Sequence, residues 1–311
     1  MILYLLKSKR FLIGFLFLAL MMVFSFLQHG PIHQIVFRSD AKGNFIDSSP
    51  YPPFSVFLLG SDRFGYNLGQ MMIQGAKYTI GSIIVVTFMR MLISLIISTM
   101  IYTLKPKYFK VLKTLFEPFS VVPQTIIAFF ILASVLWMPM TGFHTSLWQR
   151  VLFEFFILVL IAIPNLTMQL SNELRVVRKE SFIEASQTLG AGHSYIFFKH
   201  MIPHLYEKWI LLFGQQFLQV LQLLTHLGYL GLFFGGTIVQ YNSDDPPKSV
   251  SNEWSGMIAA NVDFLRFHQW MLLVPMAFFI LTAISVFFIN DSVKDYFKKK
   301  DRIREQLKSE V

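Results

Sequence analysis

Two polar stripes lie within strongly apolar stretches of the sequence, and their side chains are the ones best suited to contact a solute. The first stripe, at steps of 3, 4 and 4 residues, consists of Thr87, Arg90, Ser94 and Ser98. The second, at steps of 4, 3 and 4, consists of Gln215, Gln219, Gln222 and His226. Such steps place each set on one helix face. Hydroxyl and carboxamide groups exchange hydrogen bonds with a hydrated or zwitterionic solute without forming one deep site, so each stripe is a candidate pathway wall.

A packing role is the alternative for both stripes, because small hydroxyl and carboxamide side chains also form hydrogen bonds between membrane helices. Arg90 adds a constraint, since it falls near the middle of a long apolar run. An arginine there costs on the order of 2.5 to 3.5 kcal/mol on insertion scales, so it should face protein or water rather than lipid.

The residues needed for catalysis or metal binding are not grouped in the sequence. His200 and His204 have the i, i+4 spacing of metal ligands, but Pro203 lies between them and no His-Glu-x-x-His is present. Glu117 and Glu154 are predicted at opposite membrane faces, and the chain has no cysteine. We therefore expect no metal site and no catalytic site in this chain.

The composition indicates which elements must position these stripes. Of 311 residues, 54% are hydrophobic and 14% charged, with a mean hydropathy of +0.53, whereas soluble domains carry about 25% charged residues. The net charge of +9 comes from basic residues that flank apolar runs, which argues against nucleic acid as a partner. We predict an all-α, polytopic membrane protein with six spanning helices: Phe11 to Leu27, Tyr78 to Leu104, Phe119 to Met138, Val151 to Leu170, Trp209 to Phe234 and Trp270 to Ile289.

Lysine and arginine collect on the cytoplasmic side of membrane proteins. With the N-terminus inside, nineteen basic residues fall in inner segments and seven in outer ones. This predicts a multi-pass protein of the cell membrane with both termini cytoplasmic. We divide it into an anchor helix and outer loop (1–70), a transmembrane domain (71–295) and a basic cytoplasmic tail (296–311). The basic tail should hold the C-terminus inside and close to anionic membrane lipid. The outer loop from 235 to 268 carries Asp244, Asp245, Glu253 and Asp263, which could meet a basic rim on an external protein.

The long inner loop, residues 171–208, predicts a helix-turn-helix between the fourth and fifth spans. Ser181 can cap its first helix in a capping box with Glu184, while Gly190 and Gly192 end it. A second amphipathic stretch should then run to Pro203, which breaks it ahead of the fifth span. Phe182, Ala185 and Leu189 share one face of the first helix, an apolar ridge that could sit in a groove of a cytoplasmic partner. An ordinary interfacial amphipathic helix is the alternative.

The same loop resembles the EAA motif of ABC importer permeases. Glu184-Ala185-Ser186 is followed by Gly190 six residues after the glutamate and by Pro203 nineteen residues after it. The ending Lys199-His200-Met201-Ile202-Pro203 resembles the R-H-x-L-P form of the oligopeptide, dipeptide and nickel branch. Residues 59–67, Leu-Gly-Ser-Asp-Arg-Phe-Gly-Tyr-Asn, resemble the G-T-D-x-x-G-R-D stretch of C-type permeases, although Tyr66-Asn67 replaces its Arg-Asp. Further matches extend the resemblance over about residues 55 to 295.

This resemblance implies a permease subunit of an ATP-driven importer for peptides, nickel or metal chelates. Its partners would be a second, homologous permease, two cytoplasmic ATPases and an external substrate-binding protein. ATP and Mg²⁺ would be bound by the ATPases, and this chain would hold no cofactor. Contact with an ATPase would involve the coupling residues Phe182, Glu184, Ala185, Ser186, Leu189, Gly190 and Pro203. The alternative is an ion-gradient-driven secondary transporter, which would be expected to show internal repeats.

Overall fold

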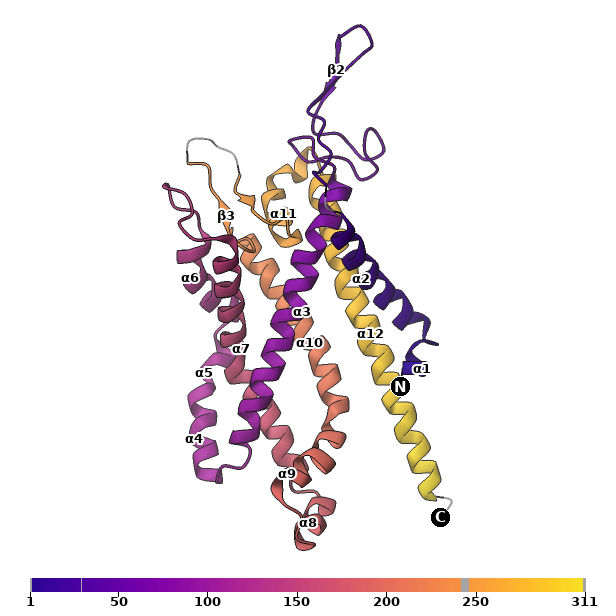
Figure 1. Cartoon of the computed structure of the whole chain (residues 1–311), viewed down its shortest axis with the longest axis vertical. Helices are drawn as coiled ribbons and strands as arrows, with labels where there is room; N and C mark the ends of the chain where they lie inside the picture. The colour runs from indigo at the N-terminus through magenta and orange to yellow at the C-terminus, as the bar shows by residue number, and fades with distance from the viewer. Residues whose placement is uncertain (1, 29, 242–245, 310–311) are drawn as a thin grey trace.

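The computed structural model describes residues 2–28, 30–241 and 246–309, and it is dominated by helices (Figure 1). The short helix α1 (Ile2–Leu5) precedes α2 (Lys9–Leu27), and the long helices that follow are α3 (Leu68–Ile101), α7 (Leu147–Val177), α10 (Ile202–Tyr229) and α12 (Trp270–Ser309). Five helical stretches of the described chain are long and apolar enough to cross a membrane, and a bent pair brings the number to six if it counts as one span. The chain is thus a polytopic, mainly α-helical membrane protein.

The bent pair corrects the third predicted span, Phe119 to Met138. Here α4 (Pro106–Phe116) and α5 (Pro118–Val121) are separated from α6 (Gln124–Leu136) by a bend of 78°. Pro123 explains the break, because a residue before proline is driven out of the helical region, and Val122 has the extended angles φ −76° and ψ 126°.

Other helix ends also differ from the prediction. Helix α3 begins at Leu68, ten residues before Tyr78, because the Asn67 side chain accepts hydrogen bonds from the amides of Gly69 (2.9 Å) and Gln70 (3.4 Å). Asparagine is one of the preferred N-cap residues, which accounts for the early start of α3. Helix α10 ends at Tyr229 rather than Phe234, ahead of Gly231 with φ +81°. Helix α12 continues past residue 295 into the basic tail without a break.

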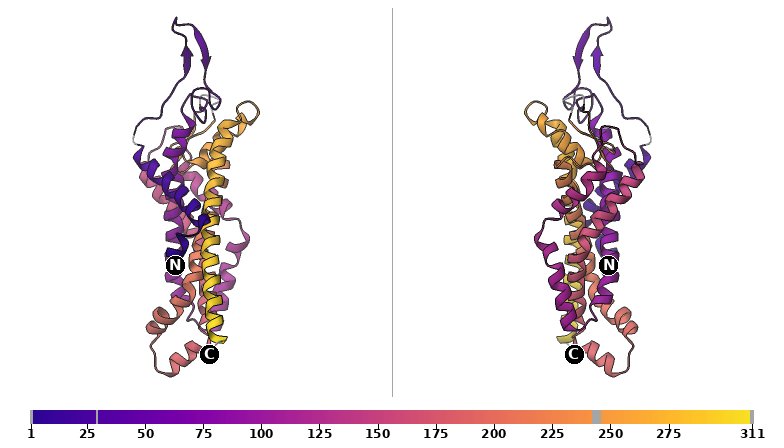
Figure 2. Two further views of the ribbon diagram at one scale, coloured as in Figure 1. Left: turned by 90° about the vertical axis from the view of Figure 1, so that its right-hand side faces the viewer. Right: turned by 90° about the vertical axis from the view of Figure 1, so that its left-hand side faces the viewer.

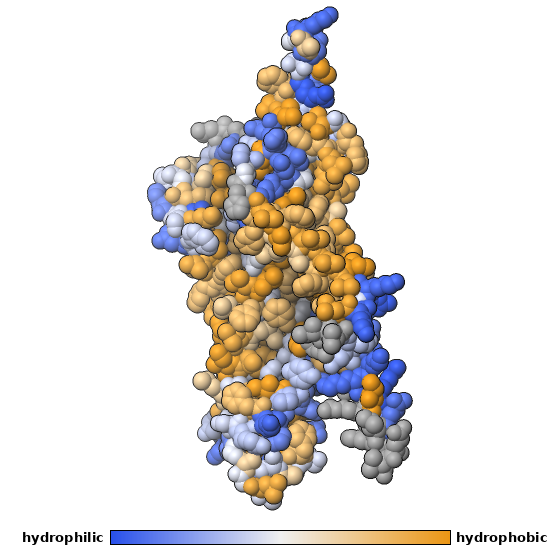
Figure 3. All heavy atoms as spheres, turned by 45° about the vertical axis from the view of Figure 1, so that its right-hand side comes forward, coloured by the Kyte–Doolittle hydropathy of each residue, from blue (hydrophilic) through white to orange (hydrophobic). Residues whose placement is uncertain are grey.

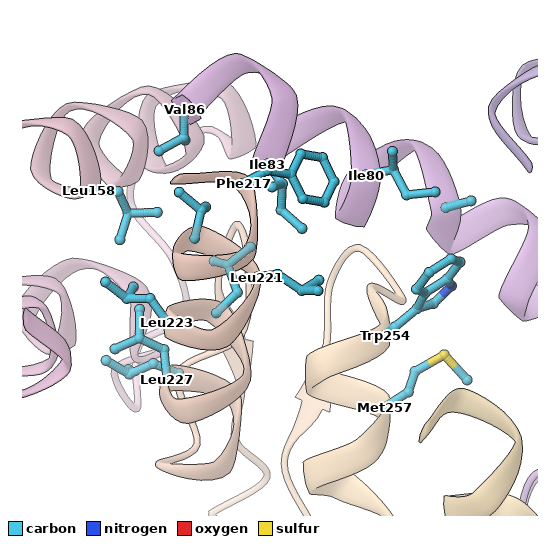
Figure 4. Packing of buried hydrophobic residues seen from close by; sticks show 14 of the residues in the cluster. Ile80, Ile83, Val86, Leu158, Phe217, Leu221, Leu223, Leu227, Trp254 and Met257 are labelled. Carbon is cyan, nitrogen blue, oxygen red and sulfur yellow. The ribbon is translucent and has the colours of Figure 1, made fainter. Parts of the chain in front are cut away.

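The main core lies where α3, α7, α10 and the short helix α11 (Trp254–Ala260) meet (Figure 4). Trp254 is fully buried there, and its ring nitrogen donates to the Met72 carbonyl oxygen at 2.9 Å. A Cβ atom at Gly75 would collide with the Asn252 carbonyl oxygen, so glycine is required for this close approach. The core therefore fixes α11 against the first turns of α3.

The two ends of the molecule are different. One end carries the hairpin β1 (Phe37–Ser39) and β2 (Phe45–Ser48), the pair β3 (Thr237–Ile238) and β4 (Lys248–Ser249), and α11 (Figures 1 and 2). The opposite end carries α8 (Ser181–Thr188), α9 (His193–Ile196) and the end of α12. A broad hydrophobic band separates hydrophilic surfaces at the two ends (Figure 3). We call these the hairpin end and the α8 end.

Candidate functional site: helix α8 and two polar helix faces

Helix α8 forms as expected but begins differently from the prediction. The capping box is wrong: Ser181 is the first helical residue, Glu180 stands at the N-cap, and no capping side-chain bond is found within the described chain. The predicted end is confirmed. Gly190 has φ +84°, its amide donates to the Gln187 carbonyl at 2.9 Å, and the Ala191 amide donates to that of Ser186 at 3.1 Å. These two bonds form a Schellman motif, which favours glycine at this position.

One side of α8 is anchored and the other is exposed. Ile183 is fully buried in a cluster with Tyr102, Leu174, Val177, Ile196, Met201 and Leu205. The predicted ridge lies outside this cluster, with Phe182 40% and Leu189 88% exposed and Ala185 exposed as well. The helix thus presents an apolar ridge from a fixed base at the α8 end of the molecule.

The chain after α8 departs from the prediction, because Pro203 does not break the helix. Residues His193 to Tyr229 form one continuous helical stretch, in which the π-helical segment Phe197–Met201 leads directly into α10. Pro203 is the second residue of α10, and the wider π-helical turn directly before it lets the helical stretch continue past the proline. This segment supports α8 from behind: Ser186 Oγ lies 3.1 Å from His200 Nε2, and the Phe182 and His204 rings are 5.6 Å apart. No group of three potential metal ligands occurs among the described residues.

The α3 stripe is buried. Thr87, Arg90, Ser94 and Ser98 are all inaccessible to solvent. Arg90 donates to the Leu158 carbonyl oxygen of α7 through Nε at 2.9 Å and Nη2 at 2.6 Å. Its Nη1, like the hydroxyls of Thr87 and Ser94, finds no hydrogen-bond partner in the described chain. In this conformation the stripe is buried inside the protein, and Arg90 links α3 to α7.

The α10 stripe is exposed along its whole length. Gln215, Gln219, Gln222 and His226 all reach the surface of this chain. Two of its side chains contact neighbours among the described residues: Gln219 Oε1 accepts from Gln216 Nε2 at 2.9 Å, and His226 Nδ1 lies 3.2 Å from Thr125 Oγ1. The face is thus available to a solute or to another protein.

A pair of buried carboxylates at the hairpin end was missed in the sequence. Glu154 of α7 accepts from the Gly235 amide at 3.0 Å, and Glu253 accepts from the Gly256 amide at 2.7 Å as the N-cap of α11. Burial raises the pKa of Glu253. Glu253 holds a turn in place and is not free to meet an external protein, which departs from the prediction for the acidic outer loop. Asp244 and Asp245 of that loop lie outside the described residues. The sequence signal that could have indicated these buried carboxylates is an acidic residue at the edge of an apolar run, because such a residue needs hydrogen-bond or charged partners.

Comparison with known proteins gives a consistent result. The chain is 25% identical over 155 residues to a putative peptide permease protein of Brucella abortus, covering 49% of this chain and 46% of that protein. It is 21% identical over 154 residues to the oligopeptide transport system permease protein OppC of Escherichia coli K12, covering 50% and 47%. The chain therefore matches about half the length of these curated relatives.

A family model for the binding-protein-dependent transport system inner membrane component matches residues 103–302, which is well over half of the chain. The matched segment includes α8, the α10 stripe and the exposed ridge described above. The chain belongs to this family of binding-protein-dependent inner-membrane permease components.

Proposed function

We propose that this protein is a permease subunit of an ATP-driven ABC importer and forms half of a translocation pathway for peptides. The family match and the relatives named as peptide permeases support this assignment. Peptides would be delivered by an external binding protein, a second permease would complete the pathway, and two cytoplasmic ATPases would supply ATP hydrolysis with Mg²⁺. The protein itself would act as a transport subunit in the cell membrane rather than as an enzyme.

The observation that carries the proposal is the exposed ridge of α8. A helix that leaves Phe182 and Leu189 in solvent exposes apolar area that a partner groove can cover. Ile183 fixes the helix to the ends of α7 and α10, so a push on the ridge would be passed directly to two spanning helices. Glu184, Ala185, Ser186, Gly190 and Pro203 would serve this coupling by shaping α8 and its support. This arrangement suits α8 as the coupling helix.

The exposed α10 stripe supports the pathway part of the proposal. Three glutamines and a histidine at the depth of a hydrophobic span are disfavoured against lipid, so protein or water should cover them. A pathway between two permeases provides both. Hydrogen-bonding side chains without net charge also suit peptide amides, which they can bind and release in succession.

The arrangement of the ends supports a cytoplasmic α8 end. The basic segment of α4 and the basic tail at the end of α12, both inner segments of the predicted topology, lie toward the same end as α8 (Figure 1). The binding protein would then approach the hairpin end. Both termini would be cytoplasmic.

Co-purification tests the proposal. The tagged chain is expected to recover a second permease and two ATPases from its native membrane in mild detergent. Leu189→Asp should lose the ATPases and keep the second permease, because Leu189 is exposed and its replacement leaves the fold intact. Leu58→Asp is the matched control, since Leu58 is also a largely exposed leucine but lies at the hairpin end. Recovery of the chain alone, or ATPase recovery that is indifferent to Leu189→Asp, would contradict the proposal.

A further inference from the structure

Helix α4 carries a basic face that the features already described do not use. Lysine recurs along the helix and at its N-cap, at Lys105, Lys107, Lys110 and Lys113. A shallow groove of about 590 Å³ on the outward face is lined by Lys107, Lys110, Val111, Thr114, Leu115 and Pro118. Val111 is 63% and Leu115 64% exposed, so the groove joins two positive charges to an apolar surface.

The opposite face of α4 holds the helix to the bundle. Phe109 is buried in a cluster with Ile101 of α3 and Met168 of α7. The Arg175 guanidinium carbon of α7 lies 4.1 Å from the centre of the Phe109 ring. Because this inner face is fixed, α4 presents its groove without further folding.

The two lysines of the groove have no acidic partner in the described chain. Neither the Lys107 nor the Lys110 ammonium group takes part in a hydrogen bond or ion pair with another described residue. Glu117 is the only acid in the segment from α4 to α5, and it forms no ion pair with a described residue either. Figure 1 shows α4 far from β3 and from α12, which lead into other acidic segments of the chain. The positive charge is therefore available to an anion from outside the protein.

Helix α7 indicates the depth of this face in the membrane, because its predicted span ends at Leu170. Phe109 contacts Arg175, five residues beyond this end. The Phe119 carbonyl oxygen, just after α4, accepts from Asn165 Nδ2 at 2.7 Å, five residues inside the span. Helix α4 thus runs from the membrane surface toward the hydrocarbon, with its lysines at the surface end.

The order of groups along the groove matches the order of groups in a phospholipid. Lysine binds phosphate as a point charge, and its stem can lie along apolar surface while the ammonium group stays at the interface. Basic residues at the cytoplasmic membrane surface attract anionic lipid in particular. Beyond the lysines, Val111, Leu115 and Pro118 offer apolar contact in the direction that an acyl chain takes.

We propose that α4 binds one anionic phospholipid of the inner leaflet, with its headgroup phosphate at Lys107 and Lys110 and an acyl chain along Val111, Leu115 and Pro118. The proposal goes beyond the proposed function, since it depends on neither the cargo nor the ATPases. It assigns the exposed face of the bent α4–α6 segment to lipid rather than to another protein.

The test uses the full-length tagged chain with the subunits that it retains in mild detergent, and native mass spectrometry counts the bound lipids. The probes are phosphatidylglycerol and phosphatidylcholine with the same acyl chains. The first phosphatidylglycerol is expected to bind about tenfold more tightly than the first phosphatidylcholine, because two lysines meet its charge. Lys107→Gln with Lys110→Gln should bind both lipids equally. Lys107→Arg with Lys110→Arg should restore the preference, which shows that the fold is retained.

Lys294→Gln with Lys298→Gln is the matched control. These lysines are also exposed and one helical turn apart, but they lie on α12, so the same charge is removed away from α4. The preference for phosphatidylglycerol should stay as in the wild type. Glycerol 3-phosphate, the soluble part of the headgroup, should not displace the bound lipid, because it lacks the acyl chain.

Four outcomes would overturn the proposal. The first two are equal affinity of the wild type for the two lipids and an unchanged preference in the double glutamine variant of α4. The third is an equal loss in the α12 control, which would indicate general attraction to a positive surface. The fourth is displacement by glycerol 3-phosphate, which would identify a free phosphate as the ligand. A chain that recruits ATPases through α8 but does not discriminate between the lipids would keep the proposed function and lose this site.

Discussion

The stripes on α3 and α10 have almost the same spacing and opposite surroundings. Both place four polar side chains on one face of a spanning helix, yet the α3 face is sealed against α7 and the α10 face is open. The difference shows that spacing determines which residues share a face, whereas the neighbouring helices determine what that face meets. Within this chain the α3 stripe is therefore part of a closed helix interface, whereas the α10 stripe is left on the surface.

The largest effect on stability is expected in α8, where a buried and an exposed side chain of one helix can be compared. Ile183→Ala in α8 removes a fully buried side chain from its cluster and should lower the free energy of unfolding by about 2 to 5 kcal/mol. Leu189→Ala should change it by less than about 0.5 kcal/mol, because Leu189 is almost fully exposed. Denaturant titration of the two variants of the reconstituted chain measures both values. Equal losses would mean that the ridge is packed rather than free.

A buried acid outside the membrane span offers a second comparison of environments. Burial raises the pKa of Asp62 from 3.8 to about 6. Because the folded state holds the proton more tightly than the unfolded state, this contribution to stability is fully present below about pH 4 and is lost as the pH rises through about 6. The change is on the order of 3 kcal/mol.

Asp62→Asn is the matched variant for this titration, because its Oδ1 can accept the hydrogen bonds that the amides of Phe64 and Tyr66 donate to Asp62. The difference in unfolding free energy between wild type and Asp62→Asn should therefore shift in favour of the variant from pH 4 to pH 7. A difference that stays constant over this range would show that Asp62 is solvated rather than buried.

Enlarging a buried member of the α3 stripe should have a moderate effect. Ser94→Leu adds volume to the closed interface with α7 and should destabilise the chain by about 1 to 3 kcal/mol. Ser134→Leu on α6 is a control, because Ser134 is exposed on its helix and should tolerate the added volume. The thermal midpoint of each reconstituted variant gives the comparison. A Ser94→Leu protein as stable as the control would indicate that α3 and α7 separate readily, as a pathway wall would require.

Much of this organisation could be predicted from the sequence. The features that could be predicted are those whose causes lie in neighbouring residues. The apolar runs gave the membrane class and most helix positions, and Gly190 marked the end of α8 because its left-handed conformation is a property of one residue. The break at Pro123 and the start of α3 at Asn67 also have local causes, although long apolar runs on either side concealed them. The sequence predicted that Arg90 avoids lipid but could not identify its partner, because that partner is a backbone carbonyl 68 positions away in α7. A pocket lined by Gln34, Phe64 and Met257 likewise joins three distant segments, and a periodic pattern in the sequence cannot predict such long-range contacts.

The smallest effect on stability is expected at Gln222 of α10, where a substitution should still reduce transport. This residue therefore separates the effect on transport from the effect on folding. Gln219→Leu would also remove the acceptor of Gln216, whose side chain is mostly buried, so its effect on transport would be mixed with a packing defect. Gln222 is exposed, and Gln222→Leu should change the unfolding free energy by less than about 0.5 kcal/mol. Peptide uptake by the assembled transporter should nevertheless fall, because an apolar side chain cannot exchange hydrogen bonds with a passing amide. Gln222→Asn keeps the carboxamide and should restore part of the uptake. If Gln222→Leu assembles and transports normally, the exposed face of α10 is a contact surface for the second permease, and the two stripes differ only in which helix covers them.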